Sequence, residues 1–508
     1  MTDSAPDPAA PPTALSSRAG RWLVVATALG SGMAFLDGSV VNVALPAIGR
    51  DLGGGITTQQ WVLDGYLLTL TALLLFGGAL GDRCGRRVVF QAGLLLFTLA
   101  SLGCGFAPDG GTLIAGRTAQ GLGGALLVPG SLALINATIR RDERSRAVGT
   151  WAGLSGVASA LGPFLGGWLV DAVSWRWVFF LNVPVAAVAA VVTARHVPES
   201  RDTGSTGPLD YPGSVAVTAG LAGAVYALIE IPGRGWSPLV IAAAVAGVLG
   251  LSAFPVVEHF QRRPLIPLEM FRSRQFIGVN IVTLTVYTGL GGALFLIALQ
   301  LQQSLGYTAL EAGLSLLPFT VIMLFLSRSV GGLVQRTGPR LPMTTGPACA
   351  AAGFALLTRA TPGAGYLGGV LPGVVVFGLG MAITVTPLTA TVLAAVDERH
   401  VGAASGANNA ISRLASLLAV AVLPLVAGLD ATGTGALGPG FTRAMLICGG
   451  ICLLGSVISF ATIGRGRRSV RVRLHLQPDL NQPCQEPSTC TTPGTAPAGT
   501  DHTGRSGG

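Results

Sequence analysis

The sequence predicts an all-α integral membrane protein, because three features of the chain indicate that lipid is its main solvent. Half of the 508 residues are hydrophobic and the mean hydropathy is +0.63. Only 11% are charged, against about 25% in ordinary soluble proteins. The apolar residues also gather into runs of about 20, the length that an α-helix needs to cross a bilayer core of ~30 Å. The sequence shows no succession of short alternating strands typical of a membrane β-barrel.

The apolar runs, taken in order, predict fourteen membrane-spanning helices. Glycine is abundant, with 73 residues, which suits the close helix contacts of a membrane bundle. The first eight helices are expected at residues 22–46, 60–81, 88–107, 112–138, 147–170, 177–194, 213–231 and 238–257. After a basic break, the last six are expected at residues 276–300, 312–334, 341–358, 366–393, 403–428 and 441–463.

The placement of arginine predicts that the N- and C-termini are both cytoplasmic. The chain contains no lysine, and most of its 32 arginines lie in alternate loops and in the C-terminal segment. The opposite loops hold only Arg50, Arg176, Arg234, Arg359 and Arg443. Excess positive charge marks the cytoplasmic side of a membrane protein, so the net charge of +9 is interpreted as a topology signal. Because the arginines lie at the ends of helices and form no single patch, no nucleic-acid partner is expected.

The two ends of the chain differ from the rest in composition. Residues 1–20 are rich in Pro, Ala and Ser, and residues 464–508 include a tail rich in Pro, Thr and Gly, so both are expected to be disordered and cytoplasmic. The five histidines fall in loops or tails and the seven cysteines form no framework, so no metal site is expected. Without lysine there is no Walker motif for ATP. We therefore expect neither enzymatic activity nor a cofactor.

A tight charged turn separates the second and third apolar runs. The segment GGALGDRCGRRVVF, residues 77–90, packs four charged residues into six positions: Asp82, Arg83, Arg86 and Arg87. The glycines at positions 78 and 85 let the helix ends approach closely, and the arginines hold this edge in the cytosol. An ordinary charged loop would explain the arginines, but it would not explain the spacing of the glycines and the charged residues together.

This spacing resembles the signature G-x-L-a-D-r-x-G-r-[RK] of the major facilitator superfamily, matched at Gly78, Leu80, Asp82, Arg83, Gly85, Arg86 and Arg87. Further segments are similar to motifs of its fourteen-span drug:proton antiporter branch. They are LDGSVVNVALPAI (36–48), LIAGRTAQGLGGA (113–125, with Arg117, Gln120 and Gly121), and GVASALGPFLGGWLV (156–170, with Gly156, Gly162, Pro163, Gly166 and Gly167). Two more phrases, SWRWVFFLNVP (174–184) and GYTALEAGLSLLP (306–318), are typical of that branch. The resemblance covers roughly residues 20–463.

The resemblance implies the major facilitator fold, in which two six-helix bundles enclose a central cavity that opens to one side at a time. The bundles are expected at residues 21–195 and 263–463, joined by two extra transmembrane helices within residues 196–262. In this family the charged turn locks the bundles in the outward-facing state. The segment GGLVQRTGPR (331–340) repeats the turn with Gln335 in place of the aspartate. The stronger latch is therefore expected in the first bundle.

Ionisable residues at membrane depth indicate function, because their burial is costly and they usually face a cavity. Asp37 lies roughly 22 Å along the first predicted helix at 1.5 Å per residue, and Arg117 lies in the same outer half of the fourth. We expect them to pair across the cavity, with Asp37 loading and releasing a proton. The alternative is a permanent salt bridge that serves packing alone.

Five further polar residues are candidates. Asp64 is expected either to act as a second carboxylate in proton coupling or to be solvated at the outer interface. Arg413, with Asn408 and Asn409 one turn before it, either serves the cavity together with Gln120 or ties the helices of the second bundle together.

The fifth predicted helix contains a glycine-proline pattern that favours antiport over symport. Gly162-Pro163 removes a backbone hydrogen bond, and Gly166-Gly167 permits close helix contact, so a bend is expected. A bent and tightly packed helix would seal the transport path against ion leak. The complete pattern, GxxxxxGPxxGG from Gly156, is more specific than small-residue spacing alone.

The sequence as a whole predicts a proton-coupled efflux transporter of the bacterial cytoplasmic membrane. Its expected partners are a lipophilic, drug- or antibiotic-like small molecule, protons and the lipid bilayer, and it is expected to be monomeric and to be driven by the proton gradient. Two alternatives remain open: a proton-coupled importer of a small metabolite, and a membrane sensor that transports nothing.

Overall fold

The computed structural model describes residues 13–201, 210–261, 268–397, 400–429 and 437–464. Within these ranges all secondary-structure elements are helices. The one β-bridge, between Thr13 and Ile139, is isolated and belongs to no strand. The structure thus confirms the predicted all-α class. Residues 1–12 and 465–508, which belong to the tails expected to be disordered, lie outside the described residues.

The first half of the chain forms seven helices, and two more follow before the second half begins. They are α1 (Arg18–Leu52), α2 (Gly55–Cys84), α3 (Arg86–Gly105), α4 (Gly110–Thr138), α5 (Arg144–Ala172), α6 (Trp177–Phe180), α7 (Asn182–His196), α8 (Tyr211–Arg234) and α9 (Pro238–Phe260). The second half opens with a short 3-10 turn, η1 (Leu268–Arg272). It continues with α10 (Arg274–Leu299), the π-helical turn η2 (Gln300–Ser304), α11 (Ala309–Ser315), α12 (Leu317–Thr337), α13 (Arg340–Leu357), the π-helical turn η3 (Tyr366–Val370), α14 (Leu371–Ala394), α15 (Val401–Ala427) and α16 (Gly438–Thr462).

In the described part of the chain, thirteen helices are long and apolar enough to cross a membrane, where the sequence predicts fourteen. The segment that falls short is α13, predicted as residues 341–358. It is helical over 18 residues, but prolines and threonines lower its hydropathy. It nevertheless packs against α14 and α16, as a helix of the bundle does. The count of fourteen spans stays a prediction.

The beginning of the described chain corrects one expectation. Residues 13–20 were included in the tail expected to be disordered, but they are ordered. The backbone of Thr13 donates to Thr138, the last residue of α4, and accepts from Arg140. Ser17 then caps α1, its hydroxyl accepting a hydrogen bond from the Gly20 amide at 3.0 Å. Capping of this kind satisfies a backbone donor that the helix start would leave unpaired.

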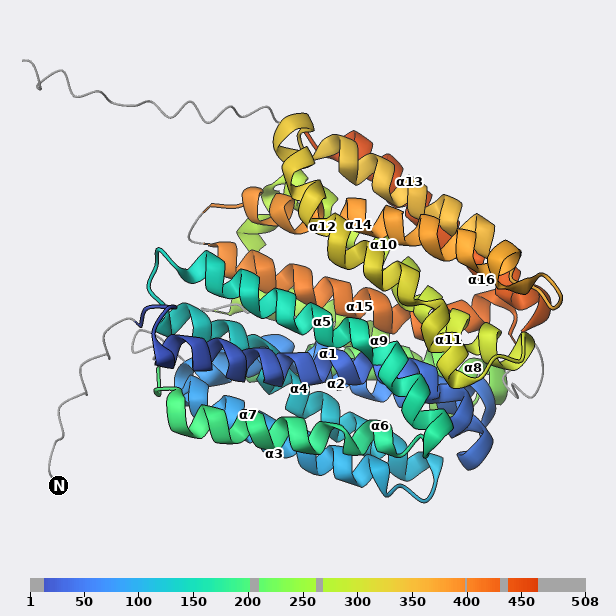
Figure 1. The fold of residues 1–508 in the computed structure, drawn as a ribbon, viewed down its shortest axis with the longest axis horizontal. Coiled ribbons are helices and arrows are strands. Elements are labelled where there is room, and N and C mark those ends of the chain that lie inside the picture. The colour runs from blue at the N-terminus through green and yellow to red at the C-terminus, as the bar shows by residue number, and fades with distance from the viewer. Residues whose placement is uncertain (1–12, 202–209, 262–267, 398–399, 430–436, 465–508) are drawn as a thin grey trace, which may run out of the picture. The chain divides into compact units, whose positions relative to one another are not determined.

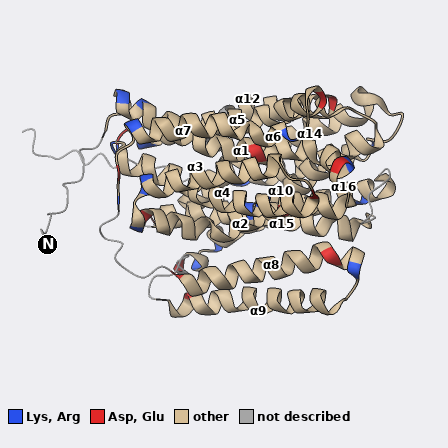
Figure 2. Cartoon of the chain, turned by 90° about the horizontal axis from the view of Figure 1, so that it is seen from below, with Lys and Arg blue, Asp and Glu red and all other residues tan. Residues whose placement is uncertain are grey.

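The helices pack in two sets (Figure 1), and α8 and α9 lie together along one side of the molecule (Figure 2). In the first set α1 packs against α5 and α7, while α4 packs against α2 and α3. In the second set α13 packs against α14 and α16, and α10 packs against α15 and α16. Glycines bring α8 and α9 together, since a Cβ atom on Gly220 or Gly223 would meet the α9 backbone. We refer to the sets α1–α7 and α10–α16 as the first and second bundle.

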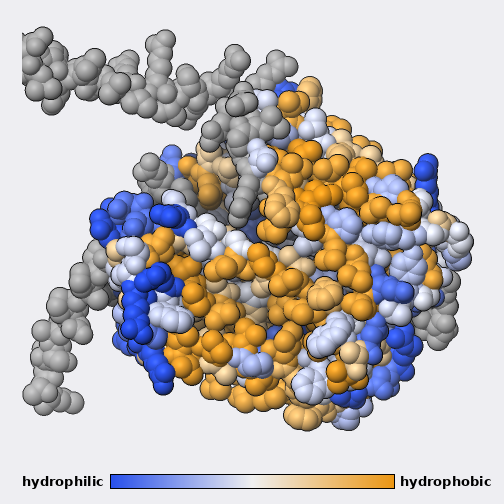
Figure 3. Space-filling model, viewed as in Figure 1, coloured by the Kyte–Doolittle hydropathy of each residue, from blue (hydrophilic) through white to orange (hydrophobic). Residues whose placement is uncertain are grey.

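Charge and hydropathy are distributed as a bilayer requires. Charged residues gather near the ends of the helices, and long stretches between carry few of them (Figure 2). The face seen in Figure 3 carries mostly hydrophobic residues between the hydrophilic ends. α9 shows the same principle in one helix, with many exposed large apolar side chains, among them Leu239, Val248, Leu249 and Phe260. Such a surface is suited to lipid and unsuited to water.

Two glutamine side chains join the bundles by hydrogen bonds. Gln60 of α2 donates to the carbonyl oxygen of Val420 on α15 at 2.7 Å. Gln302, in the π-helical turn after α10, donates to the carbonyl oxygen of Val43 on α1 at 2.9 Å. Both glutamines are buried. All four residues lie toward the helix ends that the arginine pattern predicts to be external.

A third cross-bundle contact lies at the end of α5. The Asp171 carboxylate accepts hydrogen bonds from the backbone amides of Ala309 and Leu310, at 3.2 and 2.7 Å. These amides begin α11, where Thr308 and Glu311 form a capping box. A carboxylate is stabilised at a helix start by the free amides and the helix dipole. Among the described residues, every cross-bundle hydrogen bond of the structure therefore lies in the half of the helices predicted to be external.

Candidate functional site

A fully buried ion pair lies inside the first bundle. Nη1 of Arg117 on α4 donates to Oδ2 of Asp37 on α1 at 2.5 Å, and neither side chain is accessible to solvent. The structure thus brings together the two residues that the sequence places at similar depth. Removing two charges from water is costly, and the pair recovers this cost only if further hydrogen bonds satisfy the remaining groups.

Those hydrogen bonds are present for Asp37. Oδ1 of Asp37 accepts from Nε2 of Gln120 at 3.0 Å and from Nδ2 of Asn182 at 2.9 Å. The Ser101 hydroxyl oxygen lies beside both amides, accepting from Gln120 at 2.7 Å and from Asn182 at 3.3 Å. Four helices, α1, α3, α4 and α7, thus contribute to one network. With three donors on one carboxylate, the network suits an ionised Asp37.

The Arg117 guanidinium is held on its other sides as well. Nη1 also donates to Oε1 of Gln120 at 2.8 Å, and Nε donates to the carbonyl oxygen of Val62 at 2.9 Å. The guanidinium carbon lies 4.4 Å from the centre of the Tyr66 ring, which is within cation–π range. The Tyr66 hydroxyl donates in turn to the carbonyl oxygen of Ala34 at 3.1 Å. The arginine is therefore linked to both α1 and α2.

Two atoms of this network have no hydrogen-bond partner among the described residues. They are Nη2 of Arg117, a donor, and Oδ1 of Asn182, an acceptor, and both are buried. Unpaired buried polar atoms are rare in native structures and require an explanation. The network thus keeps one unused donor and one unused acceptor.

Asp64 lies apart from the Asp37 network. It is fully buried in α2, which excludes the interfacial solvation that the sequence left open. Neither carboxylate oxygen has a hydrogen-bond partner in the described part of the chain. An isolated buried charge is very costly, so this environment accommodates a neutral, protonated carboxyl group.

Arg413 lies at the junction of the bundles. Its guanidinium carbon, from α15, lies 5.5 Å from the centre of the Phe35 ring on α1. Its Nε is buried without an acceptor, and no ion pair of the described residues includes this arginine. Of the preceding asparagines, Asn408 donates to Thr283 of α10 at 2.7 Å. Asn409 accepts from Ser412 through its backbone. Asn408 thus ties α15 to α10, whereas Arg413 faces the other bundle.

The charged turn forms its contacts within the first bundle. Arg86 donates to Asp82 through Nε and Nη2, both at 2.8 Å. Gly85 has φ 114°, a backbone conformation that side chains disfavour, and a Cβ there would also crowd Glu199. Glu199 accepts hydrogen bonds from the amides of Arg87 and Val88 and so caps α3.

The other residues of the turn make weaker contacts. A Cβ atom added to Gly78 would lie 3.5 Å from Pro129 of α4, which is an ordinary van der Waals distance. Arg83 makes no hydrogen bond or ion pair that the structure records.

The glycine pattern of α5 explains why this helix fits between α1 and α11. A Cβ on Gly162 would overlap Ser39 of α1, and one on Gly166 would lie 2.9 Å from the carbonyl oxygen of Val40. On the opposite side, a Cβ on Gly167 would lie 2.7 Å from the Cα of Leu310, at the start of α11. Pro163 contributes its carbonyl, against which Gly313 of α11 packs, whereas Gly156 has open space around it.

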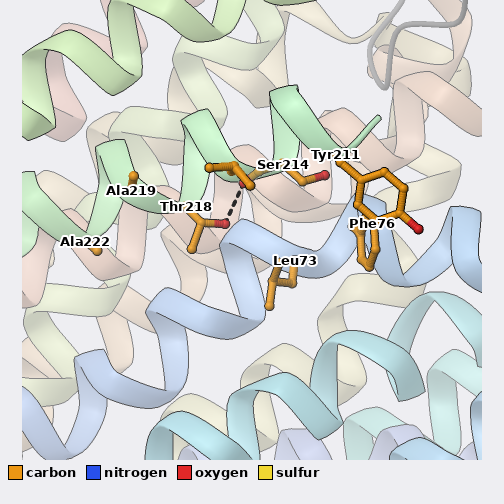
Figure 4. A pocket seen from close by; sticks show the side chains of 8 residues that line it. Leu73, Phe76, Tyr211, Ser214, Thr218, Ala219 and Ala222 are labelled. Atoms are coloured by element: carbon orange, nitrogen blue, oxygen red, sulfur yellow. Dashed lines mark hydrogen bonds between the residues drawn. The ribbon is translucent and has the colours of Figure 1, made fainter. Parts of the chain in front are cut away.

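An apolar pocket of about 390 Å³ lies between α2 and α8 (Figure 4). Its wall includes Leu73 and Phe76 of α2 and Tyr211 of α8. The hydroxyl of Thr218 donates to the carbonyl oxygen of Ser214 at 2.7 Å, and that of Ser214 donates to Asp210 at 2.7 Å. These polar groups are thus used within the helix, and none of the residues predicted to act in transport lines this pocket.

The sequence did not indicate two members of the Asp37 network, Ser101 and Asn182. Ser101 is one of many serines in apolar helices and carries no distinguishing pattern. Asn182 does belong to a recognised phrase, SWRWVFFLNVP, in which it is a strongly polar residue between apolar ones. Polar residues at membrane depth usually have a partner, so Asn182 could have been identified as a candidate from that phrase.

Comparison with known proteins gives the same family as the sequence motifs. The family model of the Major Facilitator Superfamily matches residues 27–420. The chain is 36% identical over 458 residues to the puromycin resistance protein pur8 of Streptomyces alboniger, covering 87% of this chain and 91% of that protein. It is 34% identical over 437 residues to the methylenomycin A resistance protein of Bacillus subtilis, covering 85% and 92%.

A solved structure shares the fold at much lower sequence identity. The inward open conformation of the xylose transporter XylE from E. coli superposes with a TM-score of 0.61 at 15% identity, covering 88% of this chain and 97% of that chain. The fold and the sequence motifs agree with the family match over most of the chain. The protein is a multi-pass membrane transporter that belongs to the major facilitator superfamily.

Proposed function

We propose that this protein is a proton-coupled efflux transporter that exports a lipophilic, drug- or antibiotic-like small molecule across the bacterial cytoplasmic membrane. The observation that carries the proposal is the buried Asp37–Arg117 pair with its surrounding hydrogen bonds. The resistance proteins to which the chain is similar support the direction and the class of cargo. The arginine pattern supports cytoplasmic termini.

Coupling follows from the competition of a proton and Arg117 for the same carboxylate. In the ionised state Asp37 holds Arg117 and the two amides, which ties α1 to α4 and α7. A proton on Asp37 removes the charge attraction and weakens each of these bonds. The helices can then change their relative positions. Proton binding from outside and release inside would thus alternate with the movement of substrate outward.

The substrate-facing charge in this proposal is Arg413. Its Nε has no acceptor among the described residues. The guanidinium lies near Phe35 of α1 and interacts electrostatically with Tyr66 and Tyr287. Aromatic rings supply apolar contact and the guanidinium supplies orientation, a combination common in small-molecule sites. Asp64 is retained as a second, neutral carboxyl group that could take part in proton transfer. The protein needs no second subunit for any of these contacts, and we propose a monomer.

The structure fits a state that is closed at the external end. Gln60, Gln302 and Asp171 hold the bundles together there. At the other end, the recorded partner of Asp82 is Arg86 of the same turn, not a residue of the second bundle. We propose that the turn, with Asp82, Arg83 and Arg86, engages the second bundle in the opposite, outward-facing state and so acts as the inner latch.

Asp82→Asn is expected to shift the population toward the inward-facing state and to lower export, with substrate binding largely spared. A tenfold shift needs only about 1.4 kcal/mol, which is no more than the ~1.5–3 kcal/mol that a hydrogen bond to a charged group contributes. Maleimide labelling of an Asn409→Cys position would measure this shift, as faster labelling from the cytoplasmic side, in a background with Cys84, Cys349, Cys484 and Cys490 replaced by Ser. Asp142→Asn, which removes an exposed surface pair, is the control. Unchanged labelling together with lost export would show that Asp82 does not hold the gate.

Inside-out membrane vesicles test the proposed function. With the proton pump active, vesicles that contain the protein are expected to accumulate puromycin, methylenomycin A or ethidium, and a protonophore should release the accumulated compound. A proton-coupled importer would instead empty preloaded vesicles of its substrate. A sensor would bind a compound but move none. Either of the last two outcomes would contradict export.

A further inference from the structure

The unpaired oxygen of Asn182 is the observation from which this inference starts. Nδ2 of Asn182 donates to Oδ1 of Asp37 at 2.9 Å and to the Ser101 hydroxyl at 3.3 Å. Oδ1 of the same carboxamide is buried and has no partner in the described part of the chain. Both recorded hydrogen bonds of this amide are thus made by its donor, and its acceptor is left empty.

Asn182 lies at the junction of two helices. The helical path is interrupted between α6, which ends at Phe180, and α7, which starts at Asn182. Pro184 accounts for the interruption, because proline has no amide to donate to the carbonyl four residues earlier and its ring crowds that carbonyl. That carbonyl belongs to Phe180. Asn182 of the phrase LNVP therefore lies in the turn where Pro184 removes a backbone hydrogen bond.

The other partners of Asp37 cannot present an acceptor to it. Arginine has donors only, so Arg117 can serve a carboxylate but not a carboxylic acid. Its Nη1 donates to Oε1 of Gln120 at 2.8 Å, which fixes the Gln120 amide with Nε2 toward Asp37. Of the side chains that touch Asp37 in the described structure, Asn182 alone is free to turn an acceptor toward it.

We propose that Asn182 is a positioning residue that serves Asp37 in both protonation states. With Asp37 ionised, Nδ2 donates to the carboxylate, as the structure shows. When a proton binds to Oδ1 of Asp37, the new O–H becomes a donor and the Asn182 carboxamide rotates so that its Oδ1 accepts. The proton comes from the aqueous side and leaves by the same oxygen, so no other reactant is required. The inference rests on the proposed function, in which Asp37 carries the proton.

Other groups near Asp37 do not compete for this role. Tyr66 of α2 and Cys104 of α3 are the further titratable groups that interact with Asp37 electrostatically in the described chain, besides Arg117. The Tyr66 hydroxyl is engaged with the Ala34 carbonyl, and the Cys104 thiol faces Leu113 and Gln120. Neither makes a recorded hydrogen bond to the Asp37 carboxylate.

Infrared difference spectroscopy of the full-length protein in lipid nanodiscs tests the proposal. Spectra at high and low pH are compared for protein labelled with carboxamide-¹³C asparagine, and the Asp37 carboxyl band is assigned by its loss in Asp37→Asn. Protonation of Asp37 is expected to change one asparagine carboxamide band, because that amide switches from donating to accepting. The asparagine change should vanish in Asn182→Leu, and the protonated carboxyl band should move to higher wavenumber because its O–H has lost its acceptor.

A matched control is available on the same helix. Thr193→Val removes a buried hydroxyl of α7 that bonds only within the helix, to Ala189 at 2.7 Å, and is expected to leave both bands unchanged. The wild-type asparagine signal does not depend on whether Asn182→Leu folds. An Asp37 band that titrates without any asparagine change would overturn the role of Asn182 while leaving proton carriage intact. The absence of a titrating Asp37 band would instead contradict the proposed function and the inference with it.

Discussion

Asp37→Asn is expected to reduce proton-driven export to the level of vesicles without the protein, while substrate binding remains. Asparagine keeps the shape and one acceptor oxygen for Arg117 but cannot take up a proton at any physiological pH. The variant leaves the buried Arg117 without its counter-charge, a change that costs about 3–5 kcal/mol at buried pairs. The amount of folded protein in the membrane must therefore be measured beside transport.

Two further variants sharpen this prediction. Arg117→Lys should not restore full export, because a single ammonium cannot bond Asp37, Gln120 and the Val62 carbonyl in the fork geometry of the guanidinium. Asp142→Asn, at an exposed loop pair, should export like the wild type, because such pairs contribute little. Full proton-driven export by a folded Asp37→Asn protein would remove Asp37 from the mechanism and leave the buried pair as a packing feature.

Gly162→Leu and Gly166→Leu are expected to produce the second large loss, through α1. A Cβ at Gly162 already overlaps the Ser39 side chain, and one at Gly166 lies 2.9 Å from the Val40 carbonyl oxygen. A leucine must push α1 away, and overpacking of this kind typically costs about 1–3 kcal/mol. Because Asp37 lies within one turn of Ser39 on α1, the displacement also disturbs the proton site. Transport assays should show stalled export or an increased proton leak.

Gly153→Ala provides the matched control for this helix. It is a glycine of α5 with open space at the Cβ position, so it should retain export and proton tightness. The comparison shows whether transport is lost because the contact between α5 and α1 is disrupted or simply because a glycine of α5 is replaced. Normal export and normal proton tightness in the folded Gly162→Leu and Gly166→Leu proteins would reduce the pattern to ordinary packing.

The sequence was sufficient to find the ion pair because both residues stand out physically. Asp37 and Arg117 are charges inside long apolar helices, and the helix rise alone places them at similar depth. The small residues of α5 could likewise be interpreted as a contact surface. Their partners could not be named, since neither composition nor spacing shows which helices touch. The structure supplies Ser39, Val40 and the start of α11.

Features that depend on tertiary contact were beyond the sequence. Asn182 of α7 bonds Asp37 of α1 directly, and Ser101 of α3 joins the network through Asn182 and Gln120. Likewise, Asp171 meets the start of α11 from a position 138 residues away. The interpretation of Asp64 was open for the same reason, because only packing shows that it is fully buried. The order of residues 13–20 also involves a distant contact, the pairing of Thr13 with Thr138 and Arg140 at the end of α4.

Proton movement coupled to export is the central claim, and purified protein in sealed liposomes tests it most directly. The liposomes contain a pH-sensitive dye and are given an outward or inward gradient of whichever probe compound the vesicle assay shows to be exported. Substrate flow through the wild-type protein is expected to drive protons in the opposite direction, and Asp37→Asn should abolish this proton flux. Substrate flow without any opposing proton movement in the wild-type protein would contradict the account.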